Sequence, residues 1–99
     1  MNAIPEVALV NAVVKEITQN AIVGEITQIV QELARLRRIA EVRPNDNLLA
    51  RGIVDSLAIV KLMLVLEERF PIRITDEDIV PENFRDIESL SRFVQSKLG

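Results

Sequence analysis

The chain has 99 residues, of which 48% are hydrophobic and 27% charged, and it carries a net charge of −3. Its length allows one domain with a core of its own. No apolar run reaches the roughly 20 residues that cross a bilayer, and the first residues lack the pattern of a secretory signal. We therefore expect a cytoplasmic protein with no membrane span. We also expect no nucleic-acid partner, because a nucleic-acid binder needs clustered Lys and Arg.

Neither cysteine nor histidine occurs in the sequence. Their absence excludes a thiolate nucleophile, an imidazole base and the usual ligands of a zinc site. We therefore expect no catalytic residues and no metal site, and the protein is not expected to be an enzyme. If it takes part in covalent chemistry, a group must be attached to it.

Residues 1–20 are predicted to form an N-terminal helical extension to a main domain over residues 21–99. Pro5 and Glu6 suit a first helical turn, and the apolar residues that follow recur at helical spacing. These residues are Ala3, Val7, Val10, Val14, Ile17 and Ala21. The favoured interpretation is that the extension packs on the main domain, and the alternative is a surface for docking or self-association.

A second amphipathic helix is predicted over residues 22–39. Its apolar stripe consists of Ile22, Ile26, Ile29, Leu33, Leu36 and Ala40. This stripe is out of phase with the first by one residue, which predicts two helices, or one kinked helix, with a break near Gly24. Residues 43–54 then combine turn formers with apolar anchors, which predicts a long tethered loop. The anchors are Leu48, Leu49, Ile53 and Val54.

The strongest helix signal runs from Ser56 to Phe70. Its core stripe is Ile59, Leu62, Met63, Leu66 and Phe70. Leu57, Val60 and Leu64 line up on another side, and a small bundle cannot bury both sets. An apolar row left on the surface indicates a partner-binding surface, unless the N-terminal extension covers it.

Toward the C-terminus, Thr75 and Asp78 have the spacing of a capping box that opens a short turn ended by Pro81. Asp86 is the expected N-cap of a last helix. The buried face of that helix is predicted to comprise Ile87, Leu90, Phe93, Val94 and Leu98. The expected fold is all-α: a three-to-four-helix bundle with one long loop and an N-terminal helical extension.

Asp55, Ser56 and Leu57 open the strong helix. Asp and Ser are favoured N-cap residues, so this triplet taken alone is typical of an ordinary cap. A phosphate on Ser56 would lie against free backbone N–H groups and the positive end of the helix dipole. By contrast, no base is present to activate Ser56 as a catalytic nucleophile.

The stretch from Asn47 to Phe84, NLLARGIVDSLAIVKLMLVLEERFPIRITDEDIVPENF, resembles an acyl carrier protein. The resemblance rests on Gly52 ahead of the serine, the Asp55-Ser56-Leu57 triplet, the LEERF run and the acidic turn at residues 76–78. It extends with lower specificity to the helices on either side, and so to roughly the last four-fifths of the chain.

This resemblance implies that Ser56 carries 4′-phosphopantetheine from coenzyme A, attached by a phosphopantetheinyl transferase, with Asp55 and Leu57 as flanking motif residues. The attached group ends in a thiol that holds acyl or aminoacyl groups as thioesters. It further implies that the transferase, acyl- or aminoacyl-activating ligases and downstream acyl-transfer enzymes recognise the helix after the serine. The expected partner-binding residues are Leu57, Val60, Lys61, Leu64 and Glu68.

The chain departs from housekeeping fatty-acid carriers, which usually have acidic residues where it has Ala58 and Lys61. Acidic character remains at Glu67 and Glu68. The GIVDSL form is similar to stand-alone aminoacyl carriers and carriers of secondary metabolism, which adenylating ligases serve. The alternative function is an unmodified helical protein-interaction module in which Asp55-Ser56 is only a helix cap.

Overall fold

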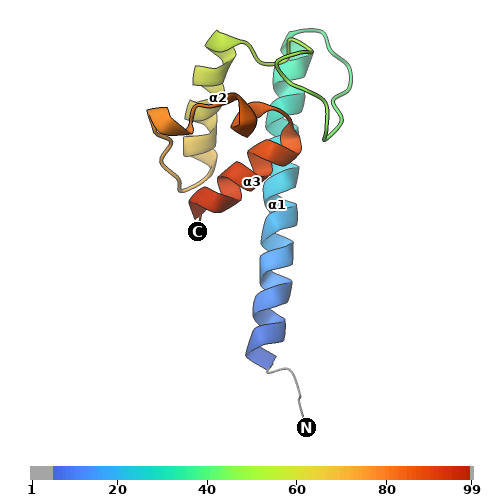
Figure 1. Ribbon diagram of the computed structural model, residues 1–99. Helices are drawn as coiled ribbons and strands as arrows, with labels where there is room; N and C mark the ends of the chain where they lie inside the picture. Colours follow the sequence, from blue (N-terminus) through green and yellow to red (C-terminus); the bar gives the residue numbers. More distant parts are fainter. Residues whose placement is uncertain (1–5, 99) are drawn as a thin grey trace.

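The computed structural model describes residues 6–98 (Figure 1). Its elements are α1 (Glu6–Leu36), α2 (Ser56–Arg69), the short 3₁₀ helices η1 (Asp76–Asp78) and η2 (Pro81–Phe84), and α3 (Ile87–Leu98). No strand occurs among the described residues, so the expected all-α bundle is confirmed. Within this part of the chain, no helix has the length and apolar character needed to cross a membrane.

The first helix, α1, runs through Gly24 without interruption, so the expected break there is wrong. A glycine inside a helix costs only about 1 kcal/mol relative to alanine. The helix ends at Leu36, earlier than expected, because the chain turns there and Arg38 adopts a left-handed φ of 60°. Helix α1 also runs across the expected boundary between the extension (residues 1–20) and the main domain (residues 21–99). The division of the chain at that boundary stays a prediction.

Residues 6–20 of α1 project away from the bundle as a stalk (Figure 1). Along the stalk, Val7, Val10, Val14 and Ile17 are between 54% and 70% exposed. The expectation that the extension packs on the main domain is therefore wrong for these residues. The reason is that their stripe lies on a different side of α1 from the residues that face the core. Ala3 and Pro5 lie outside the described residues.

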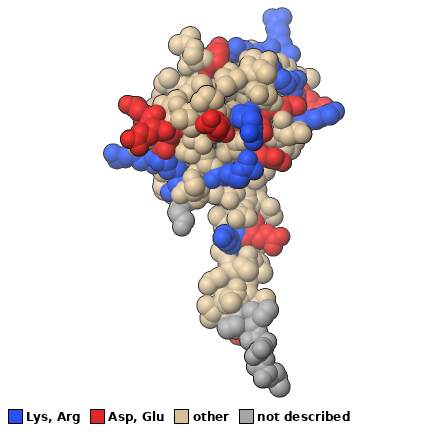
Figure 2. All heavy atoms as spheres, viewed as in Figure 1, with Lys and Arg blue, Asp and Glu red and all other residues tan. Residues whose placement is uncertain are grey.

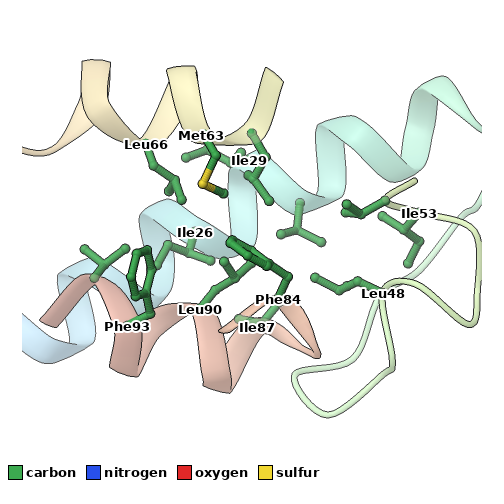
Figure 3. Close-up of a cluster of buried hydrophobic side chains, with 14 of the residues drawn as sticks. Ile26, Ile29, Leu48, Ile53, Met63, Leu66, Phe84, Ile87, Leu90 and Phe93 are labelled. Atoms are coloured by element: carbon green, nitrogen blue, oxygen red, sulfur yellow. The ribbon is translucent and has the colours of Figure 1, made fainter. Parts of the chain in front are cut away.

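The core lies between the second half of α1, α2 and α3, and the loop before α2 closes one end of it (Figure 3). The large side chains that are almost completely buried are Ile26, Val30, Leu48, Ile53, Val54, Leu62, Leu66, Phe84, Ile87, Leu90 and Val94. From η2, Phe84 meets Phe93 of α3 edge to face, with the ring centroids 6.2 Å apart. These contacts hold α2 by one side and leave its other side to solvent.

The polar caps predicted for the C-terminal half are confirmed. The carboxylate of Asp78 accepts hydrogen bonds from the N–H (2.9 Å) and hydroxyl (3.1 Å) of Thr75. That of Asp86 accepts one from the N–H of Ser89 (2.7 Å) and starts α3. Two predicted core residues are wrong, because Leu49 lies in a surface turn and Leu98 ends α3 at the edge of the bundle; both are exposed.

Candidate functional site

Ser56 is the first residue of α2, and it is exposed. The helix begins there because Asp55 has an extended backbone (φ −114°, ψ −175°) and caps the helix. The Asp55 carboxylate accepts hydrogen bonds from the N–H groups of Leu57 (3.1 Å) and Ala58 (2.8 Å). The Ser56 hydroxyl is therefore held at an accessible helix start and not in the core.

The same cap corrects one expectation about the helix N-terminus. The N–H groups of Leu57 and Ala58, which were expected to be free, are bonded to Asp55, and the N–H of Ile59 bonds the Asp55 carbonyl (2.9 Å). A phosphate on Ser56 would therefore lie near the positive end of the dipole but without these three donors. The Ser56 hydroxyl oxygen, and a group attached to it, can therefore point toward solvent.

Arg37, just after α1, holds Asp55 and the preceding turn at Gly52 in place. Its guanidinium donates to the carboxylate of Asp55 (2.6 Å) and to the carbonyl of Gly52 (3.3 Å). Gly52 has a φ of +72°, which side chains disfavour, and this turn presents its carbonyl to Arg37. The sequence did not predict this role, because Arg35, Arg37 and Arg38 all lie near the end of a predicted helix, where any cation is favourable, and nothing local distinguishes Arg37.

The pKa of Asp55 lies below its usual 3.8. The hydrogen bond from the Ala58 N–H is the largest cause, followed by the hydrogen bond from Arg37, because both stabilise the ionised carboxylate. The ionised carboxylate of Asp55 thus connects the end of the loop to Arg37, just after α1, and to the first N–H groups of α2.

Replacing Asp55 by asparagine is expected to flatten the dependence of stability on acidic pH. Because the pKa is lower in the folded than in the unfolded state, the ionised carboxylate stabilises the fold above about pH 4, and this contribution is lost as the pH falls through the folded-state value. The urea midpoint of the wild type should therefore drop more steeply with acidification than that of Asp55→Asn. Glu82→Gln, at an exposed carboxylate outside the motif, is the control, and equal slopes for wild type and Asp55→Asn would contradict the assignment.

One side of α2 presents an apolar row to solvent. Leu57, Val60 and Leu64 are 82%, 58% and 62% exposed, and the stalk does not cover them. Lys61 and Glu68, also exposed, lie beside this row. The opposite side carries the core residues Leu62, Met63 and Leu66, while Ile59 of the predicted core stripe is only half-buried.

Two of the four charged residues of α2 are bound within the chain. Glu67 accepts a hydrogen bond from the N–H of Ile74 (2.9 Å) and is turned toward the following loop. Arg69 pairs with Glu25 of α1 (2.8 Å). On the face in Figure 2, basic and acidic side chains alternate over the bundle instead of forming one patch of a single sign. The exposed side of α2 is therefore apolar in character, with Lys61 and Glu68 as its charged edge.

The arrangement offers an attachment point rather than a catalytic centre. The chain has no imidazole or thiol to activate the Ser56 hydroxyl, and no cluster of metal-binding side chains occurs among residues 6–98. An exposed hydroxyl at a helix start nevertheless fits the covalent attachment of a phosphodiester, and the apolar row next to it fits a protein that would bring one.

Residues 24–94 match the protein family described as "Phosphopantetheine attachment site". The matched region covers most of the chain and contains the Asp55-Ser56-Leu57 triplet. The chain belongs to this family. The matched region is thus a carrier domain for covalently attached 4′-phosphopantetheine. The carrier's resemblance to acyl carrier proteins, expected from its sequence, is confirmed.

Two curated relatives from Bradyrhizobium diazoefficiens are similar to this carrier. It is 35% identical to "Aminoacyl carrier protein 2" over 60 residues, which are 61% of the carrier and 66% of the relative. It is 39% identical to "Aminoacyl carrier protein 1" over 59 residues, which are 60% of the carrier and 64% of the relative. The carrier thus spans just under two thirds of the length of each relative. The roles expected of individual residues stay predictions.

Proposed function

We propose that the protein carries an aminoacyl group, or another small acyl group, as a thioester on 4′-phosphopantetheine attached to Oγ of Ser56. The observation that carries the proposal is the exposed Ser56 hydroxyl at the first residue of α2, inside the region that matches the family. The attached group supplies the thiol that the chain lacks. Asp55 and Arg37 hold the start of the helix, and Leu57 offers an apolar contact next to the hydroxyl.

An aminoacyl cargo is supported by two observations. Both relatives described above bear the name aminoacyl carrier protein. Ala58 and Lys61 stand where fatty-acid carriers usually have acidic residues, so a partner with a basic patch would lose electrostatic steering along α2. We therefore propose that an adenylating ligase loads the protein and that it does not serve general fatty-acid synthesis.

The proposed partners are a phosphopantetheinyl transferase, an activating ligase and downstream acyl-transfer enzymes. They would dock on the exposed side of α2, because an apolar centre with a charged rim is typical of protein interfaces. In this surface, Leu57, Val60 and Leu64 form the centre, and Lys61 and Glu68 the rim. Because the transferase draws on coenzyme A, we propose that the protein acts in the cytoplasm.

Incubating the apo-protein with coenzyme A and a broad-specificity transferase is expected to add the mass of one phosphopantetheine. Ser56→Ala should gain nothing because it lacks the acceptor oxygen, while Ser96→Ala, at an exposed serine of α3, should be modified like the wild type. Intact-protein mass spectrometry reads the result. An adduct on Ser56→Ala, or none on the wild type with several transferases, would refute the assignment.

The stability of Ser56→Ala tests whether the Ser56 hydroxyl contributes to the helix cap. Since Asp55 and not Ser56 bonds the first N–H groups of α2, Ser56→Ala should change the free energy of unfolding by less than about 0.5 kcal/mol. A serine that served as the cap would cost about 1 kcal/mol. Urea unfolding of the two apo-proteins provides the comparison.

A further inference from the structure

The stalk gives the carrier more surface than its mass requires. The chain exposes 6971 Å², whereas a compact protein of 11.1 kDa exposes roughly 5,700 Å². The Cα radius of gyration is 15.6 Å, compared with about 12.6 Å for a compact domain of this length. Figures 1 and 2 show the cause, since the stalk stands clear of the bundle with few charges in view.

The apolar stripe of the stalk faces away from the carrier's own core. At 100° per residue, the stripe of Val7, Val10, Val14 and Ile17 lies about 140° around α1 from the middle of the core-facing side. That side consists of the buried residues Ile22, Ile26, Ile29, Val30 and Ala34. The side of the stalk that continues the core face instead holds polar residues, namely Asn11, Lys15 and Gln19. The bundle therefore cannot cover the stripe by bending the stalk toward itself, and another molecule must do so.

The spacing of the stripe matches a coiled-coil seam. Its members Val7, Val10, Val14, Ile17 and Ala21 follow each other by three and four residues in turn, which is the heptad pattern of a and d positions. Helices that keep this 3.5-residue period pack along a shared seam.

The residues flanking this seam fit an identical chain. The e and g positions hold Asn11, Val13, Thr18 and Asn20, with Glu6 as the one charged residue at a described flanking position. In a parallel pair, Glu6 of one chain lies across from Asn11 of the other, so no like charges meet. A stalk that selected a different partner by charge would need a charged flank.

We propose that the stalk pairs in parallel with the stalk of a second copy, so that the carrier acts as a dimer. The surplus surface of roughly 1,300 Å² per chain surrounds the stalk on all sides, and pairing along the seam buries part of it. The interface is therefore expected at the lower end of the standard range of about 1,200–2,000 Å² in total. Because the core face is turned about 140° away from the seam, the two bundles lie on the outside of the pair without colliding. This dimer does not depend on the cargo or on Ser56.

Sedimentation equilibrium of the full chain should give twice the monomer mass, with dissociation on dilution. Val14→Glu, in the middle of the seam, is expected to give the monomer mass at all concentrations, since it buries two carboxylates side by side. Ala12→Glu is the matched control, because it places the same group at an exposed position on the other side of the same helical turn. It should remain dimeric, and circular dichroism should show the same helix content for all three proteins.

A second test uses the absence of cysteine from the sequence. Val14→Cys should form a disulfide-linked dimer under mild oxidation, because position 14 meets its own copy in a parallel seam, whereas Ala12→Cys should not. A monomeric wild type at high concentration, loss of the dimer in Ala12→Glu, or cross-linking of both cysteine variants alike would overturn the proposal. So would a wild type that stays monomeric and binds phosphatidylcholine vesicles through the stripe, since the occupant would then be a lipid surface.

Discussion

Replacing Leu62 by alanine is expected to lower the free energy of unfolding by about 3–5 kcal/mol. Leu62 is completely buried at the centre of α2, where it faces the core, so truncation removes packing contacts and leaves a cavity. A domain of this kind has a total stability of about 5–15 kcal/mol. Urea unfolding should therefore show a much lower midpoint, or a largely unfolded protein.

Leu64→Ala is the matched control, because it makes the same chemical change two residues later in the same helix. Leu64 is 62% exposed, and a surface substitution of this kind changes stability by less than about 0.5 kcal/mol. Similar losses for Leu62→Ala and Leu64→Ala would mean that α2 is buried on both sides, and the proposed docking surface would then be wrong.

Placing a charge in the apolar row of α2 is expected to block loading without unfolding the protein. Leu57→Asp and Leu64→Asp should each reduce kcat/KM by more than about tenfold in two reactions. These are the transfer of 4′-phosphopantetheine from coenzyme A by the transferase and the loading of the acyl group by the activating ligase. A buried interface anchor is commonly worth 2 kcal/mol or more. Because both side chains project into solvent, the circular dichroism spectra and urea midpoints should stay close to those of the wild type.

Leu9→Asp controls for the charge itself, since Leu9 is an exposed leucine of the stalk, at a distance from α2. Its kcat/KM should equal that of the wild type. If Leu9→Asp slowed loading as much as Leu64→Asp, or if Leu57→Asp and Leu64→Asp both loaded normally, α2 would not be the docking surface.

Sequence periodicity was enough to predict α2, α3 and most of their buried faces, because each of these helices packs on the bundle by one side only. The exceptions are Ile59, which is half-buried, and Leu98, which is exposed at the edge of the bundle. The sequence also marked the caps at Asp78 and Asp86, since a carboxylate three residues before or after its backbone partners is a local signal. The motif at Ser56 was recognisable for the same reason: its residues are neighbours in the chain.

Features that depend on distant contacts or on the choice of partner were harder to predict. The pairing of Arg37 with Asp55 joins residues 18 positions apart, and no local pattern distinguishes Arg37 from the arginines beside it. The change of stripe phase near Gly24 predicted a break, whereas α1 continues and the two stripes face different sides. Periodicity shows that a helix has an apolar face, but not whether its own chain covers that face.

The stalk and Ser56 lie at opposite ends of the molecule. The 31 residues of α1 extend over about 45 Å, and Arg37 ties the far end of that rod to the start of α2. Immobilising the protein through its N-terminal side should therefore leave the acceptor hydroxyl as reachable for a visiting enzyme as it is in free solution. A fluorophore attached near Val7 would likewise report on attachment to a surface without slowing the modification of Ser56.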